Sequence, residues 1–182
     1  MKKLLSTDPL LGAMQVLLIF MIGVLGFTAI MLAFGLPALV VFRDAVVAEL
    51  TANGLAGGND LILPIALAVA GLIALLALMI YFLILLRHIV TSVGEGDPFV
   101  PANADRLNRM GWLALAAQLV SYLIGGTILT FVLKVRDEAE NVQIDNEMGF
   151  SMGGVLLILV LFVLARVFRY GATMREDLEA TV

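Results

Sequence analysis

The side chains that could carry out chemistry are few and scattered along this chain. His88 is the only histidine, and no serine or carboxylate stands at a spacing that would complete a catalytic triad with it. The sequence contains no cysteine, which excludes disulfides, thiolate zinc sites and thiol catalysis. It also lacks the glycine-rich loops that cradle phosphates. We therefore expect no catalytic residue, no metal and no cofactor, and a protein that is not an enzyme.

Two polar stretches stand out against long apolar segments. The first is VGEGDPFVPANADRLNRMGW, residues 93–112, and the second is LARVFRYGATMREDLEATV, residues 164–182. Each contains two arginines three residues apart. We take these stretches as a candidate clamp or partner-binding surface. Its residues are Glu95, Asp97, Pro98, Phe99, Asn103, Arg106, Arg109, Arg166, Arg169 and Arg175.

Local signals in the first stretch predict a helix end, a turn and a new helix. Gly94 is expected to end the helix, in the left-handed conformation that glycine tolerates. Pro98 disfavours the helical conformation for Asp97. Asn103 is a suitable N-cap for the next helix, and Asp105 in its first turn would interact favourably with the helix dipole. The stretch is thus predicted to be a well-defined turn.

The charges of the two stretches suggest a contact between them. One hypothesis is that Glu95 or Asp97 pairs with Arg166 or Arg169 and so clamps the turn onto the last helix. The alternative is that the arginines extend along apolar surface into solvent and the turn is simply solvated. The residue types alone leave both interpretations open.

The elements that position these stretches follow from the composition. The 182 residues are 62% hydrophobic and 14% charged, against roughly 45–50% and about 25% in soluble domains. A chain of this length cannot bury so much apolar surface in its own core, so its solvent must be lipid. The basic residues fall at segment ends and form no nucleic-acid footprint.

Apolar segments predict an all-α integral membrane protein with one domain, residues 1–182. The first apolar run is too long for a cleaved signal peptide, so we expect it to be a retained anchor. Pro37 is expected to start or kink a following segment, ALVVFRDAVVAEL, that could form an interfacial helix. The four predicted transmembrane helices span residues 10–36, 61–86, 111–133 and 149–165.

The placement of basic residues predicts the orientation. Eight lie in one set of loops and three in the other, which puts both termini, the 87–110 loop and the 166–182 tail in the cytoplasm. The acidic 134–149 loop and the other short connections would be extracytoplasmic. The expected location is a bacterial cytoplasmic membrane. The eight are Lys2, Lys3, Arg87, Arg106, Arg109, Arg166, Arg169 and Arg175, and the three are Arg43, Lys134 and Arg136.

The spans themselves carry no deep charged residue, which weakens the case for an ion-coupled transporter. Their most polar cluster is Gln118, Ser121 and Tyr122, on one side of the third span. These side chains could join helices by hydrogen bonds or line a small-molecule pocket, and we favour the first interpretation.

Two motifs in the polar stretches also carry a family resemblance. GDPF with N-x-x-RL, followed by ARVFRxG with REDLEATV, resembles domain-of-unknown-function family twenty-nine seventy-five over essentially the whole chain. The resemblance implies a small bacterial four-helix membrane protein without an assigned activity. Genes of that family tend to lie beside small helix-turn-helix regulators. The matching positions are Gly96, Asp97, Pro98, Phe99, Asn103, Arg106, Leu107, Arg166, Phe168, Arg169 and Gly171.

Three functions are compatible with these observations. The first is a sensor or regulatory tether whose cytoplasmic loop and tail bind a soluble partner, such as a small helix-turn-helix regulator, without contacting nucleic acid directly. The second is a small transporter, channel or immunity protein acting on a lipophilic or peptide ligand. The third is a purely structural bundle. The lipid bilayer is a partner in every case, and a homodimer remains open.

Overall fold

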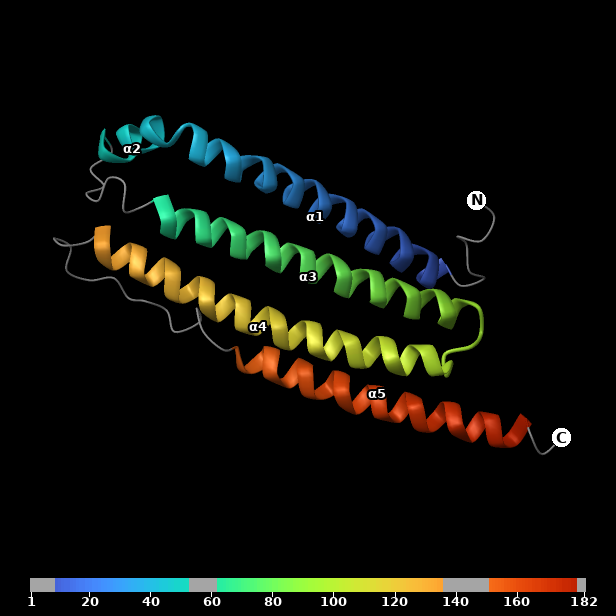
Figure 1. The fold of residues 1–182 in the computed structure, drawn as a ribbon. Helices are drawn as coiled ribbons and strands as arrows, with labels where there is room; N and C mark the ends of the chain where they lie inside the picture. The colour runs from blue at the N-terminus through green and yellow to red at the C-terminus, as the bar shows by residue number, and fades with distance from the viewer. Residues whose placement is uncertain (1–8, 53–61, 136–150, 180–182) are drawn as a thin grey trace. The chain divides into compact units, whose positions relative to one another are not determined.

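The computed structural model describes residues 9–52, 62–135 and 151–179, which form five helices (Figure 1). In chain order they are α1 (Pro9–Val41), α2 (Arg43–Ala52), α3 (Ile62–Gly94), α4 (Pro101–Val135) and α5 (Met152–Glu179). These ranges contain no strand, so the predicted all-helical fold is confirmed for the described part of the chain. Most of the acidic 134–149 segment lies outside the described residues.

Four of the helices are long and apolar enough to cross a membrane. They are Pro9–Val41, Ile62–Gly94, Pro101–Thr127 and Met152–Asp177. Each exceeds the roughly 20 residues that the hydrocarbon core requires at about 1.5 Å per residue. They correspond in order to the four predicted spans. The helices are longer than predicted because the polar residues at their ends continue the same helix.

The first helix continues through Pro37, so this proline does not start a new segment. Proline lacks an N–H group, which costs the helix one hydrogen bond but leaves the neighbouring bonds in place. The Phe42 amide still donates to the Ala38 carbonyl at 2.8 Å, and the Val46 amide donates to the Phe42 carbonyl at 3.0 Å. The segment predicted to form an interfacial helix is divided: its first residues continue α1, and its remainder forms α2 from Arg43.

Large apolar side chains cover the outside of these helices. Phe34 is 71% exposed, and Phe20, Leu63 and Leu156 are similarly open. A soluble monomer rarely exposes contiguous apolar surface of this extent, whereas hydrocarbon accommodates it without cost. The fold is therefore that of a multi-pass helical membrane protein.

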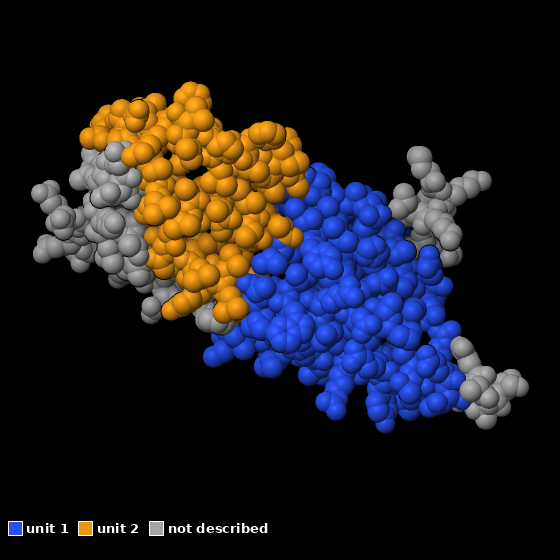
Figure 2. All heavy atoms as spheres, in the orientation of Figure 1, with its two compact units in different colours: residues 1–25, 78–116, 152–182 blue, residues 26–77, 117–151 orange. Residues whose placement is uncertain are grey.

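The chain divides into two compact units, coloured separately in Figure 2. Unit 1 comprises residues 1–25, 78–116 and 152–182, so it contains both polar stretches. Its main core joins α3, α4 and α5. The buried members of this core are Leu85, Ile89, Leu107, Met110, Leu161 and Ala165.

A second core in unit 1 joins α1 to α3. Leu18 of α1 packs with Leu83 and Val90 of α3. Nearby, the buried Gln15 amide donates a long hydrogen bond, 3.5 Å, to the Thr91 hydroxyl. The N-terminal half of α1 is thus attached to the same end of α3 that leads into the polar turn.

Unit 2 comprises residues 26–77 and 117–151. Within it α3 and α4 approach each other closely at Gly71. A Cβ atom at this position would stand only 2.5 Å from Cγ1 of Ile124. A small residue is therefore required here, as is typical of closely packed membrane helices.

The end of α3 is a Schellman motif centred on Gly96. Gly96 has a positive φ of 87°, the Gly96 amide donates to the Val93 carbonyl, and the Asp97 amide donates to the Ser92 carbonyl. This is the hydrogen-bond pattern that closes a helix when a left-handed residue follows it. The prediction that Gly94 adopts the left-handed conformation is wrong, because Gly94 is still the last residue of the helix.

Candidate functional site

Asn103 is the centre of the polar turn, and it is completely buried. Its side-chain amide donates to the Ser92 hydroxyl at 2.6 Å and to the Pro98 carbonyl at 2.9 Å. Its side-chain oxygen accepts a hydrogen bond from Arg106 at 2.7 Å. Asn103 therefore joins the end of α3, the connecting turn and the start of α4.

The predicted role of Asn103 as an N-cap is wrong. The helix α4 begins at Pro101, two residues earlier. Proline is favoured in the first helical turn because its missing N–H would have no partner there. The Asn103 amide already lies inside the helix and donates to the Val100 carbonyl at 2.8 Å, so its side chain is available for the tertiary contacts.

Arg106 contributes to the hydrogen bonds that hold the turn. It is half-buried, donates to the Asn103 side chain and makes a longer contact, 3.5 Å, with the His88 carbonyl near the end of α3. Arg106, one of the residues predicted for the clamp or partner-binding surface, thus contacts both α3 and α4, and the exposed His88 contributes its backbone carbonyl.

Two ion pairs connect the turn and α4 to α5. Arg175 pairs with Asp97, and Arg169 pairs with Asp105 at 2.9 Å. The predicted contact between the turn and the last helix therefore exists, but its partners differ. Asp97 pairs with Arg175 instead of Arg166 or Arg169, and Asp105, expected to act on the helix dipole, is the partner of Arg169.

An aromatic contact reinforces the ion pairs. The Phe99 ring lies 5.3 Å from the Phe168 ring and packs flat against Gly171. A Cβ atom at Gly171 would stand 2.7 Å from Cδ1 of Phe99, so any larger residue would displace the ring. Gly171, one of the positions that match the family, thus accommodates the Phe99 ring.

These contacts join residues 95–100 of the turn and residues 168–177 of α5 into one surface, which we call the turn–α5 surface. Glu95 lies exposed at its edge, and Phe99 remains 42% exposed although its ring is held on one side. Arg109 and Arg166 are exposed and lie outside this surface, nearer to the spans. Pro98 contributes its carbonyl to the Asn103 network.

The polar cluster of the third predicted span divides between two environments. Gln118 is buried, donates to the Ser151 carbonyl at 3.0 Å and accepts from the Ser151 amide at 3.1 Å. It thus binds the backbone just before α5, which agrees with an interhelical role. Ser121 is half-buried, and Tyr122 is 57% exposed, so the three side chains do not line one pocket.

Within residues 9–52, 62–135 and 151–179 no group of three histidine, cysteine or acidic side chains could hold a metal ion. The side chains gathered around the turn are arginines, carboxylates, an asparagine and aromatic rings. Such a set can bind and orient a partner through ion pairs and aromatic contacts.

The fold and its polar end define a four-span helical membrane protein with an ordered surface beyond one end of its spans. The chain belongs to the family described as protein of unknown function (DUF2975), whose model matches residues 46–182. The match begins within α2, so the expectation that the resemblance covers essentially the whole chain is wrong for α1. No curated protein and no solved structure matches this chain.

Proposed function

We propose that this protein is a non-enzymatic membrane sensor or tether whose turn–α5 surface binds a soluble partner. One observation carries the proposal. Ion pairs and an aromatic contact join the turn and the start of α4 to the end of α5 in one surface. The ion-paired residues are 64 and 78 positions apart in the sequence. A surface that is already ordered loses less conformational entropy when a partner binds than a flexible loop and tail would.

The distribution of basic residues supports a cytoplasmic position for this surface. Eight of the eleven lysines and arginines belong to the N-terminus, the last part of α3, the first part of α4 and the last part of α5. Cytoplasmic segments of bacterial membrane proteins carry this excess. A cytoplasmic membrane location would place the turn–α5 surface within reach of soluble regulators.

The chemistry of the surface favours a basic partner. Glu95 and Glu176 lie within two residues of the Asp97–Arg175 contact and are exposed. The exposed edge of Phe99 offers an aromatic anchor of the kind that dominates many interfaces. Small helix-turn-helix regulators, which the family resemblance implies as partners, carry basic surfaces for DNA. The same acids would repel nucleic acid itself.

A transporter or channel is less well supported. Such a protein needs polar groups along a path through its spans. The buried Gln118, the most suitable group, uses both its donor and its acceptor to hold Ser151. Its hydrogen bonds are those of a structural contact.

Charge reversal at the surface tests the proposal. Affinity capture of the tagged full-length protein from its native membranes should retain a soluble DNA-binding protein, identified by mass spectrometry. Glu95→Arg should lower its recovery at least about fivefold, because a charge pair across an interface contributes roughly 1 kcal/mol or more. Glu95 makes no side-chain contact in the structure that its replacement would break within the described residues.

Asp44→Arg provides the matched control. Asp44 is also an exposed acid, and it belongs to α2 and not to the turn–α5 surface. Recovery from this variant should equal that from the unaltered protein. The proposal fails if no soluble protein is retained, or if both charge reversals lower the recovery to the same extent.

A further inference from the structure

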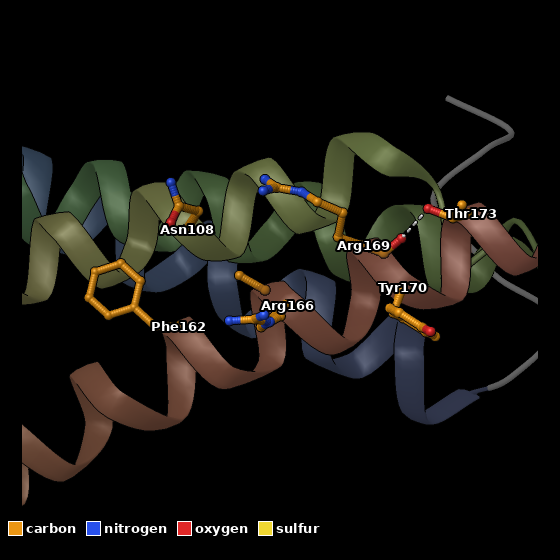
Figure 3. Close-up of a pocket in the computed structure, with 7 residues that line it drawn as sticks. Asn108, Phe162, Arg166, Arg169, Tyr170 and Thr173 are labelled. Carbon is orange, nitrogen blue, oxygen red and sulfur yellow. Dashed lines mark hydrogen bonds between the residues drawn. The ribbon is translucent and has the colours of Figure 1, made fainter.

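A cavity of about 420 Å³ is lined by residues of α4 and α5, which Figure 3 draws as sticks. Its volume falls within the range of small-molecule sites. The polar part of its lining includes Asn108 of α4 together with Arg166 and Arg169 of α5, and its apolar part includes Phe162 and Ala165. The cavity shares Arg169, Tyr170 and Thr173 with the turn–α5 surface, and its other lining residues lie outside that surface.

The polar part of the cavity carries positive charge with little to balance it. Within the described part of the chain, Arg166 has no ion-pair partner. Arg169 has one, Asp105, but both of these side chains are about two-thirds exposed, at 63% and 65%. An exposed pair of this kind contributes at most about 1 kcal/mol and is easily exchanged for a stronger anion.

Two arginines three residues apart on one helix offer the donor pattern that phosphate prefers. Each guanidinium can donate two parallel hydrogen bonds to phosphate oxygens. The Asn108 amide adds a neutral donor on the facing helix. The Thr173 hydroxyl already donates to the Arg169 carbonyl at 3.1 Å, so it remains only as an acceptor.

The apolar part of the cavity points to an amphiphile. Phe162 and Thr173 are eleven residues apart on α5, about 16 Å along the helix axis. The part of α5 before Phe162 is apolar, and its outer side chains, such as Leu156 and Leu159, are exposed as expected for contact with lipid. A molecule that fills the cavity would have its charge near the arginines and its hydrocarbon along Phe162.

We propose that this cavity binds the phosphate-bearing headgroup of an anionic phospholipid, with Arg166, Arg169 and Asn108 as donors and the acyl chains leaving past Phe162. The phosphate takes the place of Asp105 on Arg169. This ligand differs from the soluble partner proposed for the turn–α5 surface, although the two sites share Arg169. It would make the position of the α4–α5 contact sensitive to the anionic lipid content of the membrane.

The single tryptophan of the chain reports on the site. Trp112 lies edge-on to the Phe162 ring, with 5.7 Å between ring centroids. Lipid nanodiscs containing the full-length protein would carry phosphatidylglycerol or phosphatidylcholine with brominated acyl chains, which quench tryptophan fluorescence on contact. At equal mole fraction, brominated phosphatidylglycerol should quench Trp112 more strongly than brominated phosphatidylcholine.

Three substitutions distinguish a specific headgroup site from non-specific attraction between the protein's positive charges and anionic lipid. Arg166→Gln should lower the preference for phosphatidylglycerol at least about fivefold, because it removes the charge-assisted hydrogen bonds of one guanidinium to the phosphate. Asp105→Asn should raise the preference, by up to about fivefold, because it removes the competitor for Arg169. Arg87→Gln, which removes a positive charge from α3 outside the cavity, should leave it unchanged.

Opposite responses of the Arg166 and Asp105 variants would support the site even if one of them folded poorly. Equal quenching by the two lipids would overturn the proposal, and so would an Arg87 variant that behaved like the Arg166 variant. Inorganic phosphate added at millimolar concentration should not reduce the preference. If it abolished the preference, the ligand would be free phosphate, and the assignment to a lipid would be wrong.

Discussion

Replacing Asn103 with alanine should lower the free energy of unfolding by about 3 kcal/mol. The substitution removes hydrogen bonds to Ser92, Pro98 and Arg106 from a completely buried position. Each buried polar group left without a partner costs about 1–3 kcal/mol, although relaxation and water entry reduce the total. The measurement is unfolding of the purified protein in mixed micelles with increasing denaturing detergent, followed by circular dichroism.

Asn108→Ala is the matched control for this prediction. Asn108 lies five residues later on the same helix, is half-buried and makes none of the contacts that hold the turn. Its replacement should change the free energy of unfolding by no more than about 0.5 kcal/mol. Equal effects of the two substitutions would mean that the Asn103 network does not hold the turn.

Replacing Gly171 with leucine should destabilise the protein by about 2 kcal/mol, although helix propensity alone predicts the opposite sign. In a helix interior leucine is favoured over glycine by close to 1 kcal/mol. At Gly171, however, a new Cβ would stand 2.7 Å from Phe99 and would expel that ring from its contact with Phe168. Overpacking of this kind costs about 1–3 kcal/mol, and the lost aromatic pair adds to it.

Gly126→Leu should show the propensity effect without the collision. A Cβ atom at Gly126 would have no neighbour within 4 Å, and the residue is helical and exposed. This variant should be as stable as the unaltered protein or more so, in the same mixed-micelle unfolding experiment. If Gly171→Leu were also stabilising, Phe99 would not be packed against α5.

The spans could be predicted from the sequence because hydrocarbon imposes a simple rule. A backbone in lipid must satisfy its own hydrogen bonds, so each apolar run of sufficient length becomes a helix. The four predicted spans correspond to α1, α3, α4 and α5. Only their ends were misplaced, because Pro37 and the charged residues before Gly111 and after Ala165 do not interrupt the helices.

The turn was harder to predict because its residues have more than one suitable role. Both Gly94 and Gly96 could have ended α3, and the choice depends on where the last helical hydrogen bond forms. Asn103 is a good N-cap by residue type, but Pro101 starts α4 earlier and releases the asparagine side chain. Local propensity identifies a turn, while tertiary contacts decide the role of each residue in it.

The ion-pair partners could have been found from the geometry of two antiparallel helices. Asp105 pairs with Arg169. Asp97 lies eight residues before Asp105, and its partner Arg175 lies six residues after Arg169, as expected when the two segments run in opposite directions. Trp112 and Phe162 continue the same register toward the spans. Knowing any one of these contacts would have predicted the other two from the register of the helices. Residue types alone did not identify any of them.

The proposal that the turn and the end of α5 lie together on the cytoplasmic side of the membrane can be tested directly. The chain has no cysteine, so single cysteines at Glu95, Glu176 and Asp44 can be labelled with a small membrane-impermeant maleimide in living cells without a background signal. The account predicts labelling at position 44 in intact cells, and labelling at positions 95 and 176 only after the membrane is permeabilised. Labelling of position 95 or 176 in intact cells would contradict it.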